Sequence, residues 1–163
     1  MTNLENISLR DEPRSRDIAA VRAIVASTGM FNAAEIAIAE ELVTERLAKG
    51  IASGYYFVFA DEADGPVAYA CYGPIDGTAQ SYDLFWIAVA QEHQRRGLGG
   101  LLLGEAERLI TTRGGGRIYV ETSGRAQYEP TRAFYERFGY TREAVLKDFY
   151  APADDKLIYV KVV

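Results

Sequence analysis

A run of apolar residues near the middle of the chain ends in a glycine-spaced, arginine-bearing turn whose backbone is suited to binding an anion. The turn follows residues 87–89 and reads Gln-Arg-Arg-Gly-Leu-Gly-Gly. The first N–H groups of a helix have no acceptor within the helix and lie at the positive end of its dipole, so phosphate oxygens bind there readily. Glycine allows close approach because no side chain separates the ligand from the backbone. We therefore predict a pyrophosphate-binding loop formed by Gln94, Arg95, Arg96, Gly97, Leu98, Gly99 and Gly100.

The surroundings of this turn exclude two common phosphate-binding motifs. A dinucleotide-binding loop has Gly-x-Gly-x-x-Gly directly after the first strand and an acidic residue about 20 positions later. Here the preceding strand is the fourth that the sequence predicts, and three glycines crowd into residues 97–100. A nucleotide P-loop requires Gly-Lys followed by Ser or Thr, which this turn lacks.

The turn resembles motif A of the GNAT superfamily of acetyl-CoA-dependent N-acetyltransferases, Gln/Arg-x-x-Gly-x-Gly/Ala, and residues 94–99 match every specified position. A second block, residues 131–140, resembles the C-terminal signature of the family, a short helix with Phe-Tyr followed by glycine and an aromatic residue. With the order of elements from Ile7 onward, the resemblance covers nearly the whole chain. It implies a single domain over residues 1–163 of the α/β (α+β) class, with a GNAT-type mixed central sheet, a parallel splay and flanking helices.

The resemblance implies acetyl-CoA as the co-substrate. An extended pantetheine arm can bind along a free sheet edge as an added strand. In this family that edge is the end of the strand before the turn, which consists here of Ile87, Ala88 and Val89.

Side chains near the turn are expected to supplement this backbone binding. Arg95 and Arg96 would add positive charge beside the pyrophosphate or the 3′-phosphate of CoA. Tyr128 stands where many members carry an asparagine that contacts the CoA arm. We expect His93 to be an exposed turn residue without a catalytic role.

Acetyl transfer needs a neutral amine nucleophile, an electrophilic carbonyl and a proton for the leaving thiolate. Tyr135 matches the tyrosine of the Phe-Tyr signature, whose hydroxyl commonly faces the CoA sulfur, and is the candidate proton donor. Asp83 is the leading candidate base, because it lies six residues before Val89, where relatives resembling histone acetyltransferases carry a glutamate. Its shorter side chain would act through a water molecule. Glu121, on the next strand, is the alternative base, and many members need neither because they bind a deprotonated amine.

We expect the acceptor to be a primary amine of a small molecule, acetylated by direct transfer in a ternary complex. Six aromatic residues could contact an amine or its apolar body, although core packing suits them equally: Tyr72, Tyr82, Trp86, Tyr128, Phe149 and Tyr150. Phe149 and Tyr150, followed by Asp154 and Asp155, resemble the ending of peptide N-terminal acetyltransferases, which gives an alternative acceptor. A non-catalytic acetyl-CoA-binding sensor or partner is a further hypothesis, which the intact Tyr135 disfavours.

Composition sets further limits. The 163 residues are 48% hydrophobic and 25% charged, enough for one globular domain. The formal net charge of −5 argues against nucleic-acid binding and suits a cationic acceptor. No apolar run approaches the roughly 18–20 residues of a membrane span, and the N-terminus is unlike a signal peptide, so we expect a cytoplasmic protein without membrane contact. Cys71 and His93 are the only residues of their types, which leaves no His/Cys cluster for a metal. The sequence is compatible with a homodimer.

Local signals also place the elements that must position these residues. Asn32 with Glu35 predicts a capping box at a helix that Gly50 ends, and Gly29 ends the helix before it. Alternating or continuous apolar runs predict strands over residues 7–10, 55–60, 67–72, 81–89, 118–121, 140–150 and 157–163. Residues 61–65 are predicted to form a hairpin turn, and residues 151–155 to separate the last two strands.

Overall fold

The computed structural model describes residues 4–163, in which the strands form one mixed sheet with the order β1-β2-β3-β4-β5-β7-β6. β4 and β5 pair in parallel, whereas β1–β2, β2–β3, β5–β7 and β6–β7 are antiparallel. The mixed sheet and flanking helices confirm the predicted fold class. The elements are β1 (Ser8–Arg10), α1 (Asp17–Ser27), α2 (Ala33–Lys49), η1 (Gly50–Ser53), β2 (Tyr56–Glu62), β3 (Gly65–Pro74), β4 (Ser81–Val89), η2 (Gln91–His93), α3 (Leu98–Thr112), β5 (Arg117–Ser123), η3 (Ala126–Tyr128), α4 (Glu129–Arg137), β6 (Thr141–Ala151) and β7 (Asp154–Val162).

Two hairpin turns are shorter than the sequence predicts. In the β2–β3 hairpin Glu62 pairs with Gly65, so the turn consists of the two residues between them and not of five residues from Asp61 onward. β7 begins at Asp154, inside the turn predicted for residues 151–155. Acidic and small residues favour turns, but their backbone N–H and C=O groups continue a ladder equally well, so composition overestimated both loops.

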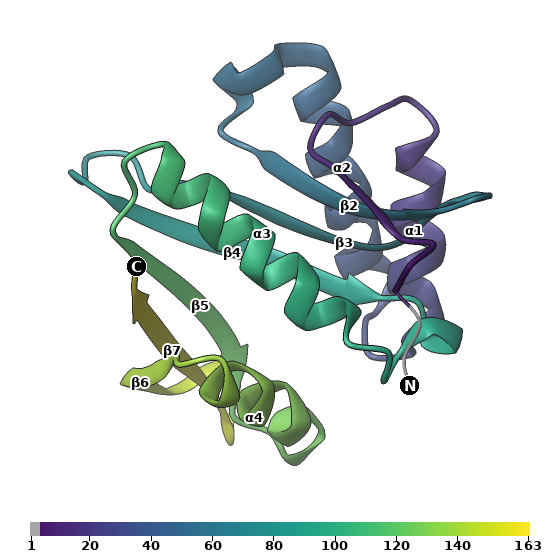
Figure 1. Cartoon of the computed structure of the whole chain (residues 1–163). Coiled ribbons are helices and arrows are strands. Elements are labelled where there is room, and N and C mark those ends of the chain that lie inside the picture. The colour runs from purple at the N-terminus through teal and green to yellow at the C-terminus, as the bar shows by residue number, and fades with distance from the viewer. Residues whose placement is uncertain (1–3) are drawn as a thin grey trace. The chain divides into compact units, whose positions relative to one another are not determined.

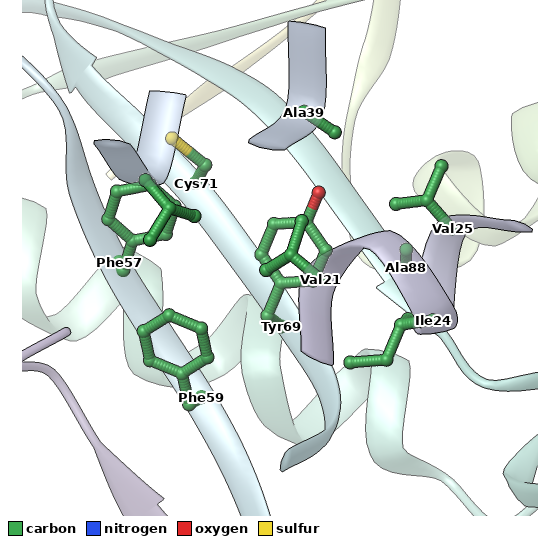
Figure 2. Packing of buried hydrophobic residues seen from close by; sticks show 10 residues of the cluster. Val21, Ile24, Val25, Ala39, Phe57, Phe59, Tyr69, Cys71 and Ala88 are labelled. Carbon is green, nitrogen blue, oxygen red and sulfur yellow. The ribbon is translucent and has the colours of Figure 1, made fainter. Parts of the chain in front are cut away.

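The chain divides into two compact units, and the first comprises residues 4–73 and 86–109. In this unit α1 and α2 pack on one face of the β2–β3 hairpin (Figure 1). Figure 2 shows the apolar side chains of these elements pointing toward one another, with Phe57 and Phe59 stacked at a centroid distance of 5.5 Å. The buried members of this cluster are Val21, Ile24, Val25, Ala39, Val43, Phe57, Phe59, Tyr69, Cys71 and Ala88.

A buried ionic network joins three elements of the first unit. Arg10 of β1 donates from Nη1 and Nη2 to Asp17 of α1 (2.8 and 3.0 Å) and from Nε and Nη2 to Asp61 of β2 (2.9 and 3.1 Å). The Asp17 side chain is 0% exposed, so its charge is stabilised by Arg10 and by the Arg14 N–H, which donates to Oδ2 at 2.6 Å. The Arg10 Cζ atom also lies 4.5 Å from the centroid of the Phe59 ring, so the guanidinium packs on an aromatic face as well as on the two carboxylates.

The helix signals of the sequence act as predicted. The Asn32 side chain accepts the Glu35 N–H (2.9 Å) at the start of α2, which satisfies a donor that has no intrahelical partner. Gly50 ends the helix at a positive φ (63°), and Gly29 follows α1 at φ 70°.

The second unit comprises residues 74–85 and 110–163 and contains the first half of β4, the strands β5, β6 and β7, and α4. After α3, the backbone at Gly115 lies close to the side chains of Ile110 and Tyr82. A Cβ at that residue would lie 2.3 Å from Ile110 Cγ2 and 2.9 Å from the ring of Tyr82, so this connection requires glycine.

Candidate active site

The candidate residues fall into two groups, one in each unit, and the first group is the predicted phosphate loop (residues 94–100). Its backbone is left-handed at Arg95 (φ 63°) and at Gly97 (φ 85°). A non-glycine residue is strained in this region, and such strain concentrates at functional sites. The first turn of α3 includes a bond from the Leu101 N–H to the Gly97 carbonyl (3.1 Å). The N–H groups of residues 98–100 precede that bond, so they have no acceptor within the helix and can bind an anion.

The end of β4 is tied to the phosphate loop by a side chain. Gln94 Nε2 donates to the Val89 carbonyl at 3.2 Å, which brings together two residues predicted to hold the cofactor. The parallel register of β4 with β5 ends at the pair Leu84–Val120, and residues 85–89 of β4 follow that pair. Ile87, Ala88 and Val89 therefore belong to the part of β4 beyond its β5 register.

Arg96 is engaged by an acidic residue of the β2–β3 hairpin. Its Nη1 donates to Glu62 Oε1 (2.7 Å) and lies 2.7 Å from His93 Nδ1. A guanidinium can only donate, so His93 Nδ1 accepts this hydrogen bond. The His93 side chain is 17% exposed, and the prediction of an exposed turn residue was wrong. The partners explain the error, because Glu62 is 34 residues away from Arg96 and no local pattern indicates it.

The second group brings both candidate bases together in the other unit. Asp83 pairs with Tyr119 across β4 and β5, and Glu121 follows Tyr119 by two residues on the same face. Burial and the neighbouring Glu121 charge raise the pKa of Asp83, whereas Lys156 opposes this shift. Lys156 Nζ forms a salt bridge with Glu121 Oε2 at 2.8 Å. The raised pKa makes the Asp83 carboxylate more basic than an ordinary aspartate, which suits a proton acceptor. Lys156 is a neighbour that sequence reasoning missed.

Tyr135 lies in α4 and is 4% exposed. Its ring contacts Phe134 and Tyr140 at centroid distances of 5.4 and 5.6 Å. Burial raises the pKa of its hydroxyl, so the group stays protonated and able to donate over the physiological range. Core packing and proton donation are therefore compatible for this residue.

The six aromatic candidates for acceptor contact differ in exposure. Tyr72 and Tyr82 are buried, at 1% and 8% exposure, and Trp86 packs on Phe31 at 5.0 Å in the first unit. Phe149 and Tyr150 are 51% and 48% exposed and meet edge to face at 5.0 Å. The remaining candidate, Tyr128, precedes α4 with the Arg125 guanidinium 5.5 Å from its ring. The exposed set lies in the second unit with the two carboxylates.

Among residues 4–163, no group of three or more His, Cys, Asp or Glu side chains is arranged to hold a metal ion. No helix among these residues is both long and apolar enough to cross a membrane.

Comparison with known proteins gives a consistent result. Residues 52–142 match the model of the acetyltransferase (GNAT) domain. A Desulfovibrio desulfuricans protein described as an acetyltransferase of the GNAT family is 48% identical, with a TM-score of 0.94 over 96% of this chain and 98% of that one. The Escherichia coli ribosomal-protein-S18-alanine N-acetyltransferase (19% identity, TM-score 0.74, 96% and 94% of the chains) and an aminoglycoside 6′-N-acetyltransferase complexed with coenzyme A (19%, 0.74, 96% of each) share the fold. A search of curated proteins found no match.

Proposed function

Because this chain belongs to the GNAT family of acetyltransferases, we propose that it transfers the acetyl group of acetyl-CoA directly to a primary amine of a small molecule in a ternary complex. The observation that carries the proposal is the phosphate loop, whose left-handed Arg95 and Gly97 lead into the N-terminus of α3. Such a loop is suited to the pyrophosphate of CoA. An aminoglycoside acetyltransferase of the same fold is known with coenzyme A bound, which supports the same ligand here.

The proposed binding residues act mainly through their backbone. The N–H groups of Gly97, Leu98, Gly99 and Gly100 would hold the pyrophosphate, while Gln94 keeps the loop against the end of β4. The pantetheine arm would lie along Ile87, Ala88 and Val89 as an added strand. Arg95 and Arg96 would contribute positive charge, and Tyr128 would replace the missing asparagine contact.

The proposed chemistry uses two side chains of the second unit. Acetyl-CoA supplies the electrophilic carbonyl and a thiolate leaving group. Asp83 would accept the ammonium proton through a water molecule, with Glu121 as the alternative acceptor. Tyr135 would donate its hydroxyl hydrogen to the thiolate. The nitrogen loses two protons as the ammonium becomes an amide: the first would leave through Asp83 to solvent, and the second would restore the Tyr135 hydroxyl after its hydrogen has gone to sulfur. One proton is thus released per turnover. The amine would attack the thioester carbonyl directly, so no covalent enzyme intermediate would form.

Two alternative hypotheses concern the acceptor and the presence of catalysis. The fold neighbours include an enzyme named for an alanine of a ribosomal protein and one named for aminoglycosides, with equal TM-scores. A peptide N-terminus is therefore the alternative acceptor, and a non-catalytic acetyl-CoA sensor is the alternative to an active enzyme. The proposed location is the cytoplasm, where acetyl-CoA is available. A homodimer is a further proposal, which sedimentation of the protein would test.

A single assay separates these alternatives. The protein is incubated with acetyl-CoA and, in parallel, with small amines, aminoglycosides and peptides, while thiol release and acetylated product are measured. We expect amide formation with a small amine to exceed that with peptides. Faster acetylation of a peptide N-terminus would establish the alternative acceptor, and tight acetyl-CoA binding without product from any amine would identify a sensor.

A further inference from the structure

The two candidate bases and the exposed aromatic residues form one surface in the second unit, which we call the acidic–aromatic cluster: Asp83, Glu121, Lys156, Phe149 and Tyr150. Lys156 is its centre, because Nζ lies 2.8 Å from Glu121 Oε2 and 4.2 Å from the centroid of the Phe149 ring. Phe149 meets Tyr150 edge to face, and Tyr150 interacts electrostatically with Glu121. Asp83 belongs to the cluster through Glu121, which follows the strand partner of Asp83, Tyr119, by two residues on β5 and whose charge acts on the Asp83 carboxylate.

The charge of the cluster is negative. The single cation, Lys156, is held by Glu121 and by the face of Phe149, and its side chain is only 13% exposed. Among residues 4–163 Asp83 forms no salt bridge. Nearby Arg125 is also paired, because its Nε lies 3.2 Å from Asp154 Oδ2. A second ammonium would compensate Asp83, whereas a carboxylate would add a like charge beside Asp83 and Glu121.

The apolar part of the cluster is exposed. Phe149 and Tyr150 keep about half of their surface accessible, although aromatic side chains usually gain stability from burial. Lys156 covers one face of Phe149, and the rings of Phe149 and Tyr150 lie at right angles. The ring surface that stays accessible can contact a flat ligand, and such contacts add about 0.5–1.5 kcal/mol, which corresponds to roughly 2- to 13-fold in affinity. The rings therefore suit an aromatic or similarly flat body attached to the amine.

We infer that the preferred acceptor is a primary amine on an aromatic or similarly flat apolar body, with no carboxylate beside the amine. This inference rests on the proposed acetyl transfer to a small amine and specifies its substrate class. Phenethylamine has all the required features. Phenylalanine adds a carboxylate to the same skeleton, and butylamine lacks the ring.

The charge requirement is tested with phenethylamine and phenylalanine, comparing kcat/KM per free amine from thiol release. We expect phenethylamine to be favoured at least about tenfold, because one like-charge contact near a protein surface is worth more than the 1.4 kcal/mol of a tenfold ratio. Lys156→Met makes the cluster more negative and should widen the ratio, whereas Glu121→Gln should narrow it. Lys161→Met, on the same strand, should leave the ratio unchanged.

The ring requirement is tested with phenethylamine and butylamine. Phe149→Ala should remove most of the preference for the ring, and Val145→Ala, another exposed residue of β6, should retain it. Three results would overturn the inference. The first is an equal kcat/KM for phenylalanine and phenethylamine, and the second is a shift of their ratio in the same direction by Lys156→Met and Glu121→Gln. The third is a preference for phenethylamine over butylamine that survives Phe149→Ala. Thiol release with none of the amines would instead refute the proposed function itself.

Discussion

Burial has different consequences for the two proposed catalytic side chains. It raises the pKa of both Tyr135 and Asp83. For a phenol this means that the hydroxyl remains a hydrogen-bond donor, and for a carboxylate it means greater basicity at the cost of folded-state stability. The two roles can therefore be separated by substitutions that keep the shape of each side chain.

Replacement of Tyr135 by phenylalanine keeps the ring between Phe134 and Tyr140 and removes only the hydroxyl. We expect kcat to fall by about 10² to 10⁴-fold, as for other positioned proton donors, with nearly unchanged acetyl-CoA affinity. Tyr140→Phe is the matched control, because Tyr140 is also buried and its ring packs against the ring of Tyr135. Wild-type turnover in Tyr135→Phe, measured with a substrate for which chemistry limits the rate, would make Tyr135 a core residue only.

Asp83→Asn should lower activity and increase stability together. A carboxyl whose pKa is raised by folding destabilises the folded state once ionised; this penalty is absent below the unfolded-state pKa near 4, and it grows as pH rises through the folded-state pKa. The variant should therefore have a higher Tm at neutral pH, and the gain should shrink as pH falls toward 4. Its kcat/KM should fall roughly tenfold or more at neutral pH and recover at alkaline pH, where free amine is abundant.

Asp76→Asn, in an exposed turn, controls for the loss of one negative charge. A lower Tm for Asp83→Asn, together with an activity deficit that does not depend on pH, would assign Asp83 a structural role.

At the scale of elements, the Glu62–Arg96 ion pair connects the β2–β3 hairpin to the phosphate loop. Glu62 offsets part of the Arg96 charge at 2.7 Å. Glu62→Gln should therefore increase the positive potential at the loop and tighten acetyl-CoA binding about two- to tenfold in calorimetry, more at low salt. Asp64→Asn, in the same hairpin, should have a smaller effect. Weaker binding of acetyl-CoA by Glu62→Gln would show that the pair braces the loop and that Arg96 does not serve the ligand.

The ionic network of β1, α1 and β2 makes a prediction about stability alone. Arg10→Met leaves the fully buried Asp17 carboxylate without its main partner, so the free energy of unfolding should fall by about 3–5 kcal/mol. Arg22→Met breaks a pair whose arginine side chain is 70% exposed and should cost no more than about 1 kcal/mol. Urea unfolding of both variants measures the difference, and equal losses would contradict the role given to Arg10.

At the scale of the whole molecule, the sequence predicts what depends on local chemistry. Asn32 with Glu35 and the glycine at residue 50 mark helix ends because capping involves neighbours in the chain. The 94–100 pattern predicts a turn that opens a helix, and this turn lies between β4 and α3 as predicted, although no glycine pattern indicates the positive φ of Arg95. Family resemblance added the mixed sheet, which the structure confirms.

Partnerships between distant residues could not be predicted in this way. Glu62 with Arg96 and Glu121 with Lys156 each join residues more than 30 positions apart, and the charge pattern around each residue gives no sign of its partner. His93 was placed in solvent for the same reason. The roles of Tyr135, Asp83 and Glu121 remain predictions, which the variants above test.

The most direct test of the account follows the acetyl group itself. The protein is mixed with acetyl-CoA labelled with ¹³C at the carbonyl, first alone and then with phenethylamine, and the label is followed by NMR while free thiol and intact protein mass are measured. Direct transfer predicts no thiol release and no labelled protein before the amine is added, and afterwards one thiol for each amide formed. Labelled protein, thiol release without amide, or bound acetyl-CoA that never reacts with the amine would contradict the account.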